Sequence, residues 1–544
     1  MENFKNILIK FKSLNLLFVL LSTSLFSVED CASTAITGII VTRDGTDLSQ
    51  INRDKGVHIL FQNDEIKGAS STLESYIGDD LNDINIQKIK DSLLSYLSDH
   101  HIFAMVTLPP QDSTDGILIV QLLFSCVSEV CYIGQKWFPT YLFESRIPIE
   151  SGEEVNQEKM LNDISFMNRN PFRRTEMIYS PGKEKGTTDV EILTKDRLPL
   201  RVWFRADSTG LKPSDTIRLI AGGTWGNMFN VGDVLTYQYS TSPDFHQFQS
   251  HLLMYTSYLP WQDILYIYGT YGTSHPDIRN FKSDGEYGQA SCRYQIPFKP
   301  YYTTFTHKVE LGSDFKYLNS NLFFSGVETA SSARQESVYI TQIIANYSLR
   351  AIWENHQLTS KFEIVASPAK GLFPNQEDSK YSSLRPGAKA RYAYFKGSFG
   401  YRYLLPWDFS LSLLLRGQGA TDPLLSSEQF ALGGIDTVRG YVQTAFLADN
   451  AFVSNLAFYF PTFTLFRRFE DKSTFYLFYD VAYGSNYQPI SDAVSDQYMS
   501  GVGGGYIFEV LPYLSCKTDY GFKLNEIDGD IFFGRFYFSV TASY

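Results

Sequence analysis

An arginine in a glycine-rich segment and an aspartate on a later strand are the residues best suited to chemistry. Arg439 stands near the end of the run Leu432-Gly433-Gly434-Ile435-Asp436-Thr437-Val438-Arg439-Gly440-Tyr441, and Asp480 closes Phe478-Tyr479-Asp480. A guanidinium can hold a carboxylate through two parallel charge-assisted hydrogen bonds, which would fix a loop in one place. No nucleophile–base set or pair of carboxylates stands out, so we expect no enzyme activity and no metal or cofactor site.

The pattern of the strand around Asp480 indicates where its side chain points. One apolar face of that strand is formed by Phe475, Leu477, Tyr479 and Val481. Phe478 and Asp480 therefore lie on the opposite face, because successive side chains of a strand alternate. In a barrel with an apolar outer wall that face lines the lumen. A long loop with a single arginine is usually only a solvated surface loop, so the residues alone leave its role open.

Almost everything after residue 198 alternates between apolar and polar residues, as in Leu200–Asp207, which indicates β-strands. A soluble sandwich shows the same alternation. However, these strands are long enough for a tilted bilayer crossing, and their polar faces carry charges that suit a hydrated lumen. About sixteen candidate strands predict a transmembrane antiparallel β-barrel over residues 198–544. Residues 417–450 do not alternate and are expected to form a long loop.

Two small modules that mix helix and strand precede the predicted barrel. Residues 36–127 contain a strand, a helix over Gln87–Leu97 with apolar residues at helical spacing, and two further strands. A similar order of elements recurs over residues 128–197, with a helix over Gln157–Met167. We therefore expect two α+β modules in tandem, each of marginal size on its own.

The N-terminal residues 1–30 have the pattern of a secretory signal peptide. A basic start with Lys5 and Lys10 precedes a short apolar stretch and a polar end. Either Ser27 or Ala35 fits as the last residue of the signal, so the cleavage site stays open. The signal predicts that the mature chain leaves the cytoplasm.

Composition limits the class of protein further. The net charge of −12 argues against a nucleic-acid partner, and no basic cluster overrides it. After residue 30 no apolar run is long enough for a spanning helix, so the chain can cross a membrane only as a closed barrel. Cys126 and Cys131 would face opposite ways on one strand and could pair only across a turn, so a disulfide between them stays open.

The loop and strand motifs resemble those of the barrel superfamily that assembles outer-membrane proteins and secretes two-partner substrates. The likeness rests on Val438-Arg439-Gly440-Tyr441 and on Phe478 with Asp480. It implies that the four loop residues tip a long extracellular loop, here within residues 417–450, that folds back into the lumen. It also implies that Arg439 meets Asp480 on the inner barrel wall.

This resemblance predicts that the Arg439 loop is latched inside the pore. We expect the ion pair to be partly solvated and worth about 1–3 kcal/mol, which would hold the loop and still let it rearrange. Gly501–Tyr506 resembles the glycine-rich strand that follows in the family, although glycines in a wall strand explain it equally well. Ala482 stands where the family often has glycine.

The front modules resemble the two POTRA domains of two-partner secretion transporters. The first likeness rests on Leu108-Pro109-Pro110-Gln111 and the second on Met167–Arg173 with Pro181-Gly182. The resemblance implies a pore in the outer membrane, with both modules in the periplasm, that exports one large extended exoprotein of the haemolysin or adhesin type. Outer-membrane lipids and the barrel assembly machinery that inserts the pore are its other expected partners.

An export mechanism without nucleotide hydrolysis follows from these expectations. A free strand edge in a front module would hold the extended client by β-augmentation, which recognises backbone more than sequence. No nucleotide is present outside the inner membrane, so the client's own folding outside the cell would drive its exit. The sequence names neither the client nor the strand edge that binds it.

Two other functions fit parts of the sequence. An outer-membrane protein insertion factor would share the barrel motifs, although such factors usually carry more than two modules. A passive porin for small solutes would explain the barrel. It would leave both front modules and the Arg439 loop without a role.

Overall fold

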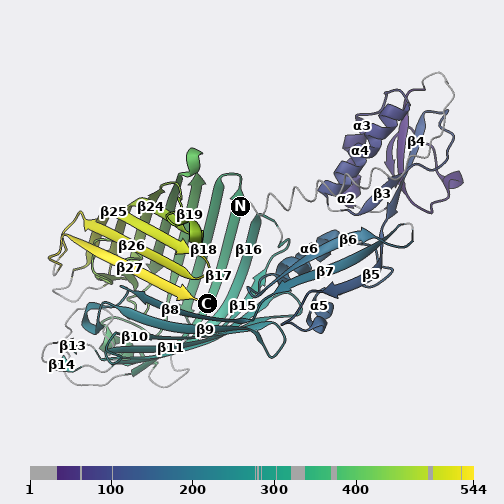
Figure 1. Ribbon diagram of the computed structural model, residues 1–544. Helices are drawn as coiled ribbons and strands as arrows, with labels where there is room; N and C mark the ends of the chain where they lie inside the picture. Colours follow the sequence, from purple (N-terminus) through teal and green to yellow (C-terminus); the bar gives the residue numbers. More distant parts are fainter. Residues whose placement is uncertain are drawn as a thin grey trace. The chain divides into compact units, whose positions relative to one another are not determined.

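The computed structural model describes residues 34–61, 64–100, 102–184, 186–275, 277–278, 281–282, 285–301, 303–319, 337–368, 376–487, 494–527 and 530–544. The predicted signal peptide, residues 1–30, lies outside the described residues. The chain forms two compact units (Figure 1). The first contains residues up to Cys126 with the short segments 154–156 and 184–187, and the second contains the other described residues.

The first unit packs helices against a four-stranded sheet. Its strands, in the order β2-β1-β4-β3, are β1 (Gly38–Arg43), β2 (Gly56–Ile59), β3 (Ala104–Thr107) and β4 (Ile117–Phe124). Its helices are α2 (Asp64–Lys67), α3 (Ala69–Glu74) and α4 (Asp83–Asp99), and a 3₁₀ helix, η2, spans Leu48–Gln50. The side chain of Asn82 caps α4, and Ile89, Leu93 and Leu97 repeat at helical spacing and are buried in the core. The helix predicted over Gln87–Leu97 is therefore confirmed.

The second unit begins with a three-stranded sheet and two helices, which we call the second module. Its strands, in the order β5-β7-β6, are β5 (Cys126–Ile133), β6 (Arg173–Pro181) and β7 (Thr187–Asp196). Its helices are α5 (Thr140–Arg146) and α6 (Gln157–Met167). Cys126 and Cys131 both lie on β5 as free thiols, so the structure has no disulfide between them.

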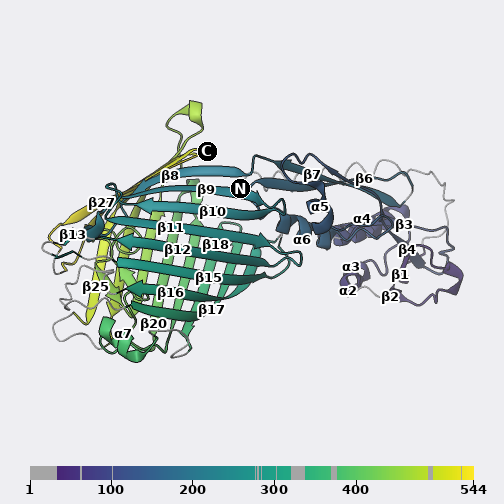
Figure 2. The same ribbon diagram turned by 90° about the horizontal axis from the view of Figure 1, so that it is seen from below.

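Sixteen antiparallel strands then form a closed barrel, as the sequence predicts (Figures 1 and 2). In chain order they are β8 (Leu200–Asp207), β9 (Arg218–Met228), β10 (Asp233–Thr241), β11 (Phe248–Tyr258), β12 (Ile264–Ser274), β15 (Gly285–Pro297), β16 (Phe305–Asn319), β17 (Ser337–Trp353), β18 (His356–Ser367), β19 (Tyr392–Leu404), β20 (Ser410–Ala420), β23 (Asn450–Tyr459), β24 (Lys472–Ser485), β25 (Asp496–Val510), β26 (Leu514–Lys523) and β27 (Gly534–Ser543). The last strand, β27, pairs with β8 and closes the ring.

Short elements lie in the connections between the barrel strands. They are the two-stranded pairs β13 (Asp277–Ile278) with β14 (Phe281–Lys282) and β21 (Phe430–Leu432) with β22 (Phe446–Ala448), the helix α7 (Asp378–Leu384), and the 3₁₀ helices η3 (Lys212–Ser214), η4 (Pro406–Asp408) and η5 (Arg467–Phe469). In Figure 2, α7 lies close to the ends of β17 and β20. The sequence pattern predicts none of these short elements.

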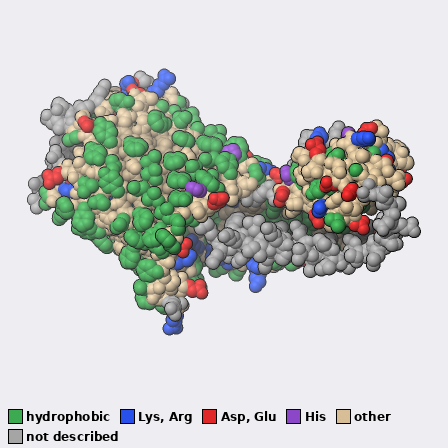
Figure 3. All heavy atoms as spheres, turned by 90° about the horizontal axis from the view of Figure 1, so that it is seen from above, with side chains coloured by type: hydrophobic (Ala, Val, Ile, Leu, Met, Phe, Trp, Pro, Cys, Tyr) green, Lys and Arg blue, Asp and Glu red, His purple; other side chains and the backbone are tan. Residues whose placement is uncertain are grey.

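Alternation along the strands gives the barrel an apolar outer surface. On β24, Phe475, Leu477 and Tyr479 are exposed, whereas Phe478 and Asp480 are buried on the other face. The side of the barrel seen in Figure 3 is covered almost continuously by hydrophobic side chains. Such a surface suits lipid rather than water. Within the described residues, no helix has the length and apolar character needed to cross a membrane.

The second module docks on turns at one end of the barrel, which we call the module end. Asn170, fully buried, donates hydrogen bonds to the carbonyl oxygens of Gly226 (2.7 Å) and Gly232 (2.9 Å) beside the β9–β10 turn. Tyr141 of α5 donates to the Asn230 carbonyl at 2.7 Å. Because the strands are antiparallel, the connections that include α7 and residues 421–449 lie at the opposite end, the far end.

Candidate functional site

The candidate site is built around residues 421–449, which connect β20 to β23 and which we call the inner loop. β20 continues to Ala420 and β23 begins at Asn450, so the connection is slightly shorter than the expected loop of residues 417–450. Inside it, β21 and β22 form a small hairpin. Val438 and Tyr441 near its tip are fully buried against the inner faces of the barrel strands. The inner loop therefore occupies part of the lumen.

Arg439 at the tip of the inner loop binds Asp480 on β24 through two parallel hydrogen bonds. Its Nε donates to Oδ2 at 2.7 Å and its Nη2 to Oδ1 at 2.8 Å, while its backbone N–H donates to Oδ2 at 3.1 Å. Nη1 donates to Asp519 Oδ1 on β26 at 3.3 Å. The guanidinium also lies 3.4 Å from the ring centroid of Phe478. The arginine is thus held by two carboxylates and an aromatic ring.

The ion pair is buried, so the expectation that it would be partly solvated is wrong. The side chain of Arg439 is 8% exposed and that of Asp480 is 0% exposed. Burial alone would lower the pKa of Arg439, but the hydrogen bond to Asp480 and the charges of Asp480 and Asp519 outweigh it and raise that pKa. The guanidinium therefore stays charged. Removing Arg439 would leave Asp480 as a buried charge without its ion-pair partner, and removing Asp480 would leave Arg439 with Asp519 alone.

The other predicted tip residues also contact the wall. The Gly440 N–H donates to the Tyr537 hydroxyl at 3.0 Å, and Tyr441 donates to the carbonyl oxygens of Ser500 and Asn525 at 3.0 and 2.8 Å. Gly440 has φ +108°, a backbone conformation that L side chains rarely adopt. All six residues expected at this site, Val438, Arg439, Gly440, Tyr441, Phe478 and Asp480, therefore lie together.

Several wall residues that hold the tip are absent from the sequence prediction. Asn455 on β23 donates to both Asp480 Oδ1 (2.7 Å) and the Thr437 carbonyl (2.6 Å). A Cβ added at Gly501 would overlap the Arg439 carbonyl oxygen, and one at Gly521 would lie 2.6 Å from the Gly440 nitrogen. The absence of side chains at Gly501 and Gly521 therefore creates the groove in which the tip lies. Alternation could have predicted that Asp519 faces the lumen. It does not predict which strands meet at the tip of the inner loop.

The lumen wall away from the tip is polar and charged. A cavity of about 350 Å³ is lined by residues of both signs from β15 to β19, namely Arg293, Glu310, Asp314, Lys316, Lys361, Glu363 and Lys396. Arg293 Nη2 donates to Asp314 at 2.6 Å. No cluster of His, Cys, Asp or Glu among the described residues could hold a metal ion. The arrangement can therefore bind and position polar groups.

Comparison with known proteins places this architecture among secretion proteins. A family model described as "Haemolysin secretion/activation protein ShlB/FhaC/HecB" matches residues 186–506. The chain is 22% identical to "Heme/hemopexin transporter protein HuxB" of Haemophilus influenzae over 454 residues, which cover 80% of this chain and 76% of the relative.

Two solved structures share the fold of nearly the whole chain. CdiB from Escherichia coli has a TM-score of 0.74 and 14% identity, covering 97% of this chain and 93% of that one. CdiB from Acinetobacter baumannii has a TM-score of 0.66 and 15% identity, covering 98% of this chain and 97% of that one. At these identities the likeness shows a common fold.

Proposed function

The chain belongs to the haemolysin secretion/activation protein family ShlB/FhaC/HecB, the transporters of two-partner secretion, and we propose that it captures an unfolded exoprotein in the periplasm and exports it through its barrel. The family role is that of a secretion pore. The finer proposal concerns the location of the barrel, the path of the client and the part played by the inner loop. The proposed client is a large exoprotein of the haemolysin or adhesin type.

The apolar outer wall supports a location in the outer membrane. Exposed aromatic and aliphatic residues cover the barrel, and the strands are joined in a ring without free edges, as lipid requires. In this orientation the module end faces the periplasm and the far end faces the outside. The second module, which docks on the module end, then stands where a newly secreted polypeptide arrives.

The charged wall from β15 to β19 supports passage of an extended polypeptide. Its ion pairs Arg293–Asp314 and Lys361–Glu363 place positively and negatively charged side chains along the cavity. An unfolded client exposes apolar side chains, and a wall on which charged side chains separate Met254, Ile344 and Val365 offers them little continuous apolar surface. The client can therefore move along this wall without binding to it.

The buried Arg439–Asp480 pair is the single observation that carries the proposed mechanism. It fixes the inner loop against β24 with Asn455 and Asp519 as further partners. We assign Val438, Arg439, Gly440 and Tyr441 the role of a latch, with Phe478 and Asp480 as its wall partner. The latch gives the pore a defined narrow state, and client passage requires the loop to rearrange around it.

A secretion assay tests the proposed function directly. The chain is expressed with a candidate client, namely any large signal-bearing exoprotein encoded beside its gene, and the exoprotein is measured in the medium. We expect secretion with the full chain and none after deletion of residues 36–196, because the client is captured by the front modules. Export by the deletion variant would overturn the capture step. If other barrel proteins fail to insert when the full chain is absent, the chain is instead an insertion factor.

A further inference from the structure

The inner loop is also fastened at its base, far from the Arg439 latch. Arg385, which directly follows α7 in the connection between β18 and β19, binds Asp449, the last residue of the inner loop. Arg385 Nη1 donates to Asp449 Oδ1 at 2.5 Å and Nη2 donates to Oδ2 at 2.6 Å. The side chain of Asp449 is 0% exposed and that of Arg385 is 17% exposed. This pair is therefore nearly as buried as the Arg439–Asp480 pair.

Asp449 joins three far-end connections at once. Besides Arg385, its carboxylate accepts hydrogen bonds from the backbone N–H of Leu424 at 3.0 Å and of Tyr487 at 2.9 Å. Gln429 donates to Asp449 Oδ1 at 3.2 Å. The segment after α7, the inner loop and the start of the β24–β25 connection thus meet at one buried carboxylate.

Glu428 fastens the first limb of the inner loop to a different part of the wall. Its carboxylate accepts hydrogen bonds from Lys316 on β16 (2.8 and 3.1 Å), Gln342 on β17 (2.7 Å) and Tyr394 on β19 (2.8 Å). Burial alone would raise the pKa of Glu428, but the Lys316 charge and these hydrogen bonds outweigh it and lower the pKa to about 2. The inner loop therefore spans the lumen, from β16–β19 to the latch on β24–β27.

An apolar cluster fills the space between these fastenings. It is formed by inward-facing wall residues together with residues of the inner loop and of the connection that contains α7: Val338, Ile340, Ile344, Val365, Tyr381, Ala388, Ala390, Tyr392, Tyr394, Leu424 and Leu425. On β17, Val338 and Ile340 are fully buried, whereas Ile343 on the opposite face is 56% exposed. Most of this stretch of lumen wall is thus covered, and Ile344, Val365 and Tyr394 at its edge also line the charged cavity.

We infer that Arg385, Glu428 and Asp449 are positioning residues that seal the far end of the lumen, and that this seal must open before a polypeptide can leave. The inference rests on the proposed export function and adds a second closure to it. Opening exposes the apolar cluster and separates a buried ion pair, so the closed state is favoured when no client is present.

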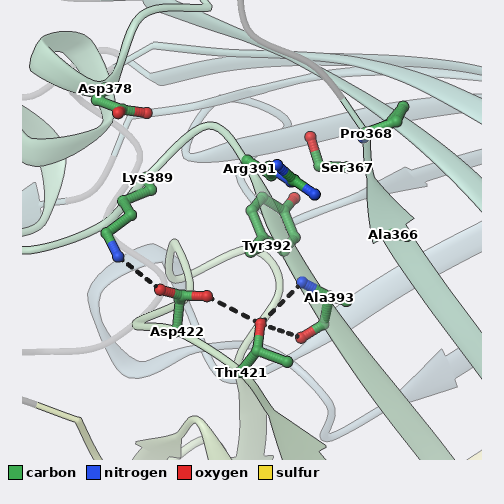
Figure 4. A pocket seen from close by; sticks show the side chains of 10 residues that line it. All are labelled: Ala366, Ser367, Pro368, Asp378, Lys389, Arg391, Tyr392, Ala393, Thr421 and Asp422. Atoms are coloured by element: carbon green, nitrogen blue, oxygen red, sulfur yellow. Dashed lines mark hydrogen bonds and ion pairs between the residues drawn. The ribbon is translucent and has the colours of Figure 1, made fainter.

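A surface ion pair beside the seal provides a matched control. Lys389 donates to Asp422 at 2.9 Å across the same two connections, at the edge of a cavity of about 570 Å³ (Figure 4). The side chains of Lys389 and Asp422 are 57% and 24% exposed. An exposed pair of this kind contributes little to closure, because water screens it.

Chemical labelling from outside the cell tests the seal. The reporter is Leu425→Cys, a position 3% exposed in the structure, in a chain whose native cysteines are replaced by serine. Intact cells are treated with a membrane-impermeant maleimide. With Arg385→Ala we expect labelling to rise at least about tenfold, the change produced by a shift of about 1.4 kcal/mol between closed and open states. Lys389→Ala should leave labelling unchanged, and Arg385→Lys, which keeps the charge, should give an intermediate rate.

Two outcomes would overturn the inference. Equal labelling in the Arg385→Ala and Lys389→Ala backgrounds would show that Arg385 does not hold the loop. The second outcome concerns a variant in which Arg385→Cys and Asp449→Cys are joined by a reducible bifunctional thiol reagent. Export should stop while the bridge is intact and resume on reduction, so export through the bridged protein would show that the seal need not open. The labelling assay needs no client, so its result stands whether or not the proposed secretion is observed.

Discussion

The guanidinium of Arg439 interacts with three side chains. It has two parallel hydrogen bonds to Asp480, a third to Asp519 and the ring of Phe478 under its plane. In a buried place such interactions are stronger than in water, and an unpaired charge there is correspondingly costly. A single side chain can therefore decide where the tip of the inner loop lies.

Replacement of Arg439 should release the tip of the inner loop. Arg439→Ala leaves Asp480 buried without its ion-pair partner, which costs about 3–5 kcal/mol, while Asp519 keeps only Lys517 at 3.5 Å. We expect client secretion to fall sharply while the barrel still reaches the membrane in its heat-resistant folded form. Arg174→Ala, at an exposed arginine of the second module, is the control and should secrete normally. Normal secretion by Arg439→Ala would remove the basis of the latch.

The glycines of the wall give a second test at the scale of one residue. In Gly501→Ala the new methyl group overlaps the Arg439 carbonyl oxygen, so the tip must move away from β25. We expect this variant to behave like Arg439→Ala in secretion. Gly504→Ala lies on the same strand, but its Cβ comes no closer than 3.6 Å to its neighbours. Equal secretion by the two variants would show that close contact between tip and wall is unimportant.

The sequence predicts the latch pair only through its likeness to a family, because the two residues come from different strands and alternation shows only the face that Asp480 occupies. The same limit hides Asp519, Tyr537 and Gly521, whose contacts with the tip depend on the closed barrel. The degree of burial is equally invisible in the sequence. It depends on how the inner loop packs, and for that reason the expected partial solvation is wrong.

At the scale of elements, strands are predicted well and short elements are not. Period-two alternation survives over the nine or more residues of most barrel strands, whereas β2, β21, β22 and α7 are too short to show a period. Arg385 follows α7, so the far-end seal leaves no signal in the sequence. On β17 both faces carry apolar residues, Ile340 inward and Ile343 outward, so the pattern cannot tell lumen from lipid.

Docking of the second module on the barrel should depend on Asn170. Asn170→Ala leaves the buried carbonyl groups of Gly226 and Gly232 without donors, at a cost of about 1–3 kcal/mol. We expect the distance between spin labels at Glu176 of the module and Glu354 of a barrel turn to become broadly distributed. Asn52→Ala, at an exposed site in the first unit, should keep the distribution narrow. A narrow distribution in Asn170→Ala would contradict the docking role.

The far-end seal should withstand moderately acidic medium. Because the pKa of Glu428 is lowered to about 2, its ionised form stabilises the closed loop fully above its ordinary pKa of 4.5. That contribution is lost only as the pH falls towards 2. Because only the thiolate reacts with maleimide, labelling is expressed relative to that of a fully exposed reporter cysteine at the same pH, and we expect this ratio for Leu425→Cys to be equal at pH 7 and pH 5. Opening between these values would show that another group controls the seal, and Glu428→Gln should label faster at both.

At the scale of the whole molecule, the barrel separates an apolar exterior from an interior that is part charged and part sealed. In the proposed mechanism the charged wall suits passage, while the inner loop, held at its tip by Arg439 and at its base by Asp449, closes the lumen in the absence of a client. Because separate ion pairs hold the base and the tip of the inner loop, the far end of the lumen and the tip can open one after the other. Folding of the client outside would then make its exit irreversible.

Site-specific cross-linking of a client stalled in export tests whether the client passes through the barrel lumen. Lys361 lines the lumen cavity, and its neighbour Phe362 on the same strand is 59% exposed on the outer wall. With a thiol-reactive cross-linker at Lys361→Cys or at Phe362→Cys, the account predicts that the stalled client is captured at residue 361 and not at residue 362. Capture at residue 362 alone, or at neither position while the client still reaches the medium, would contradict export through the lumen.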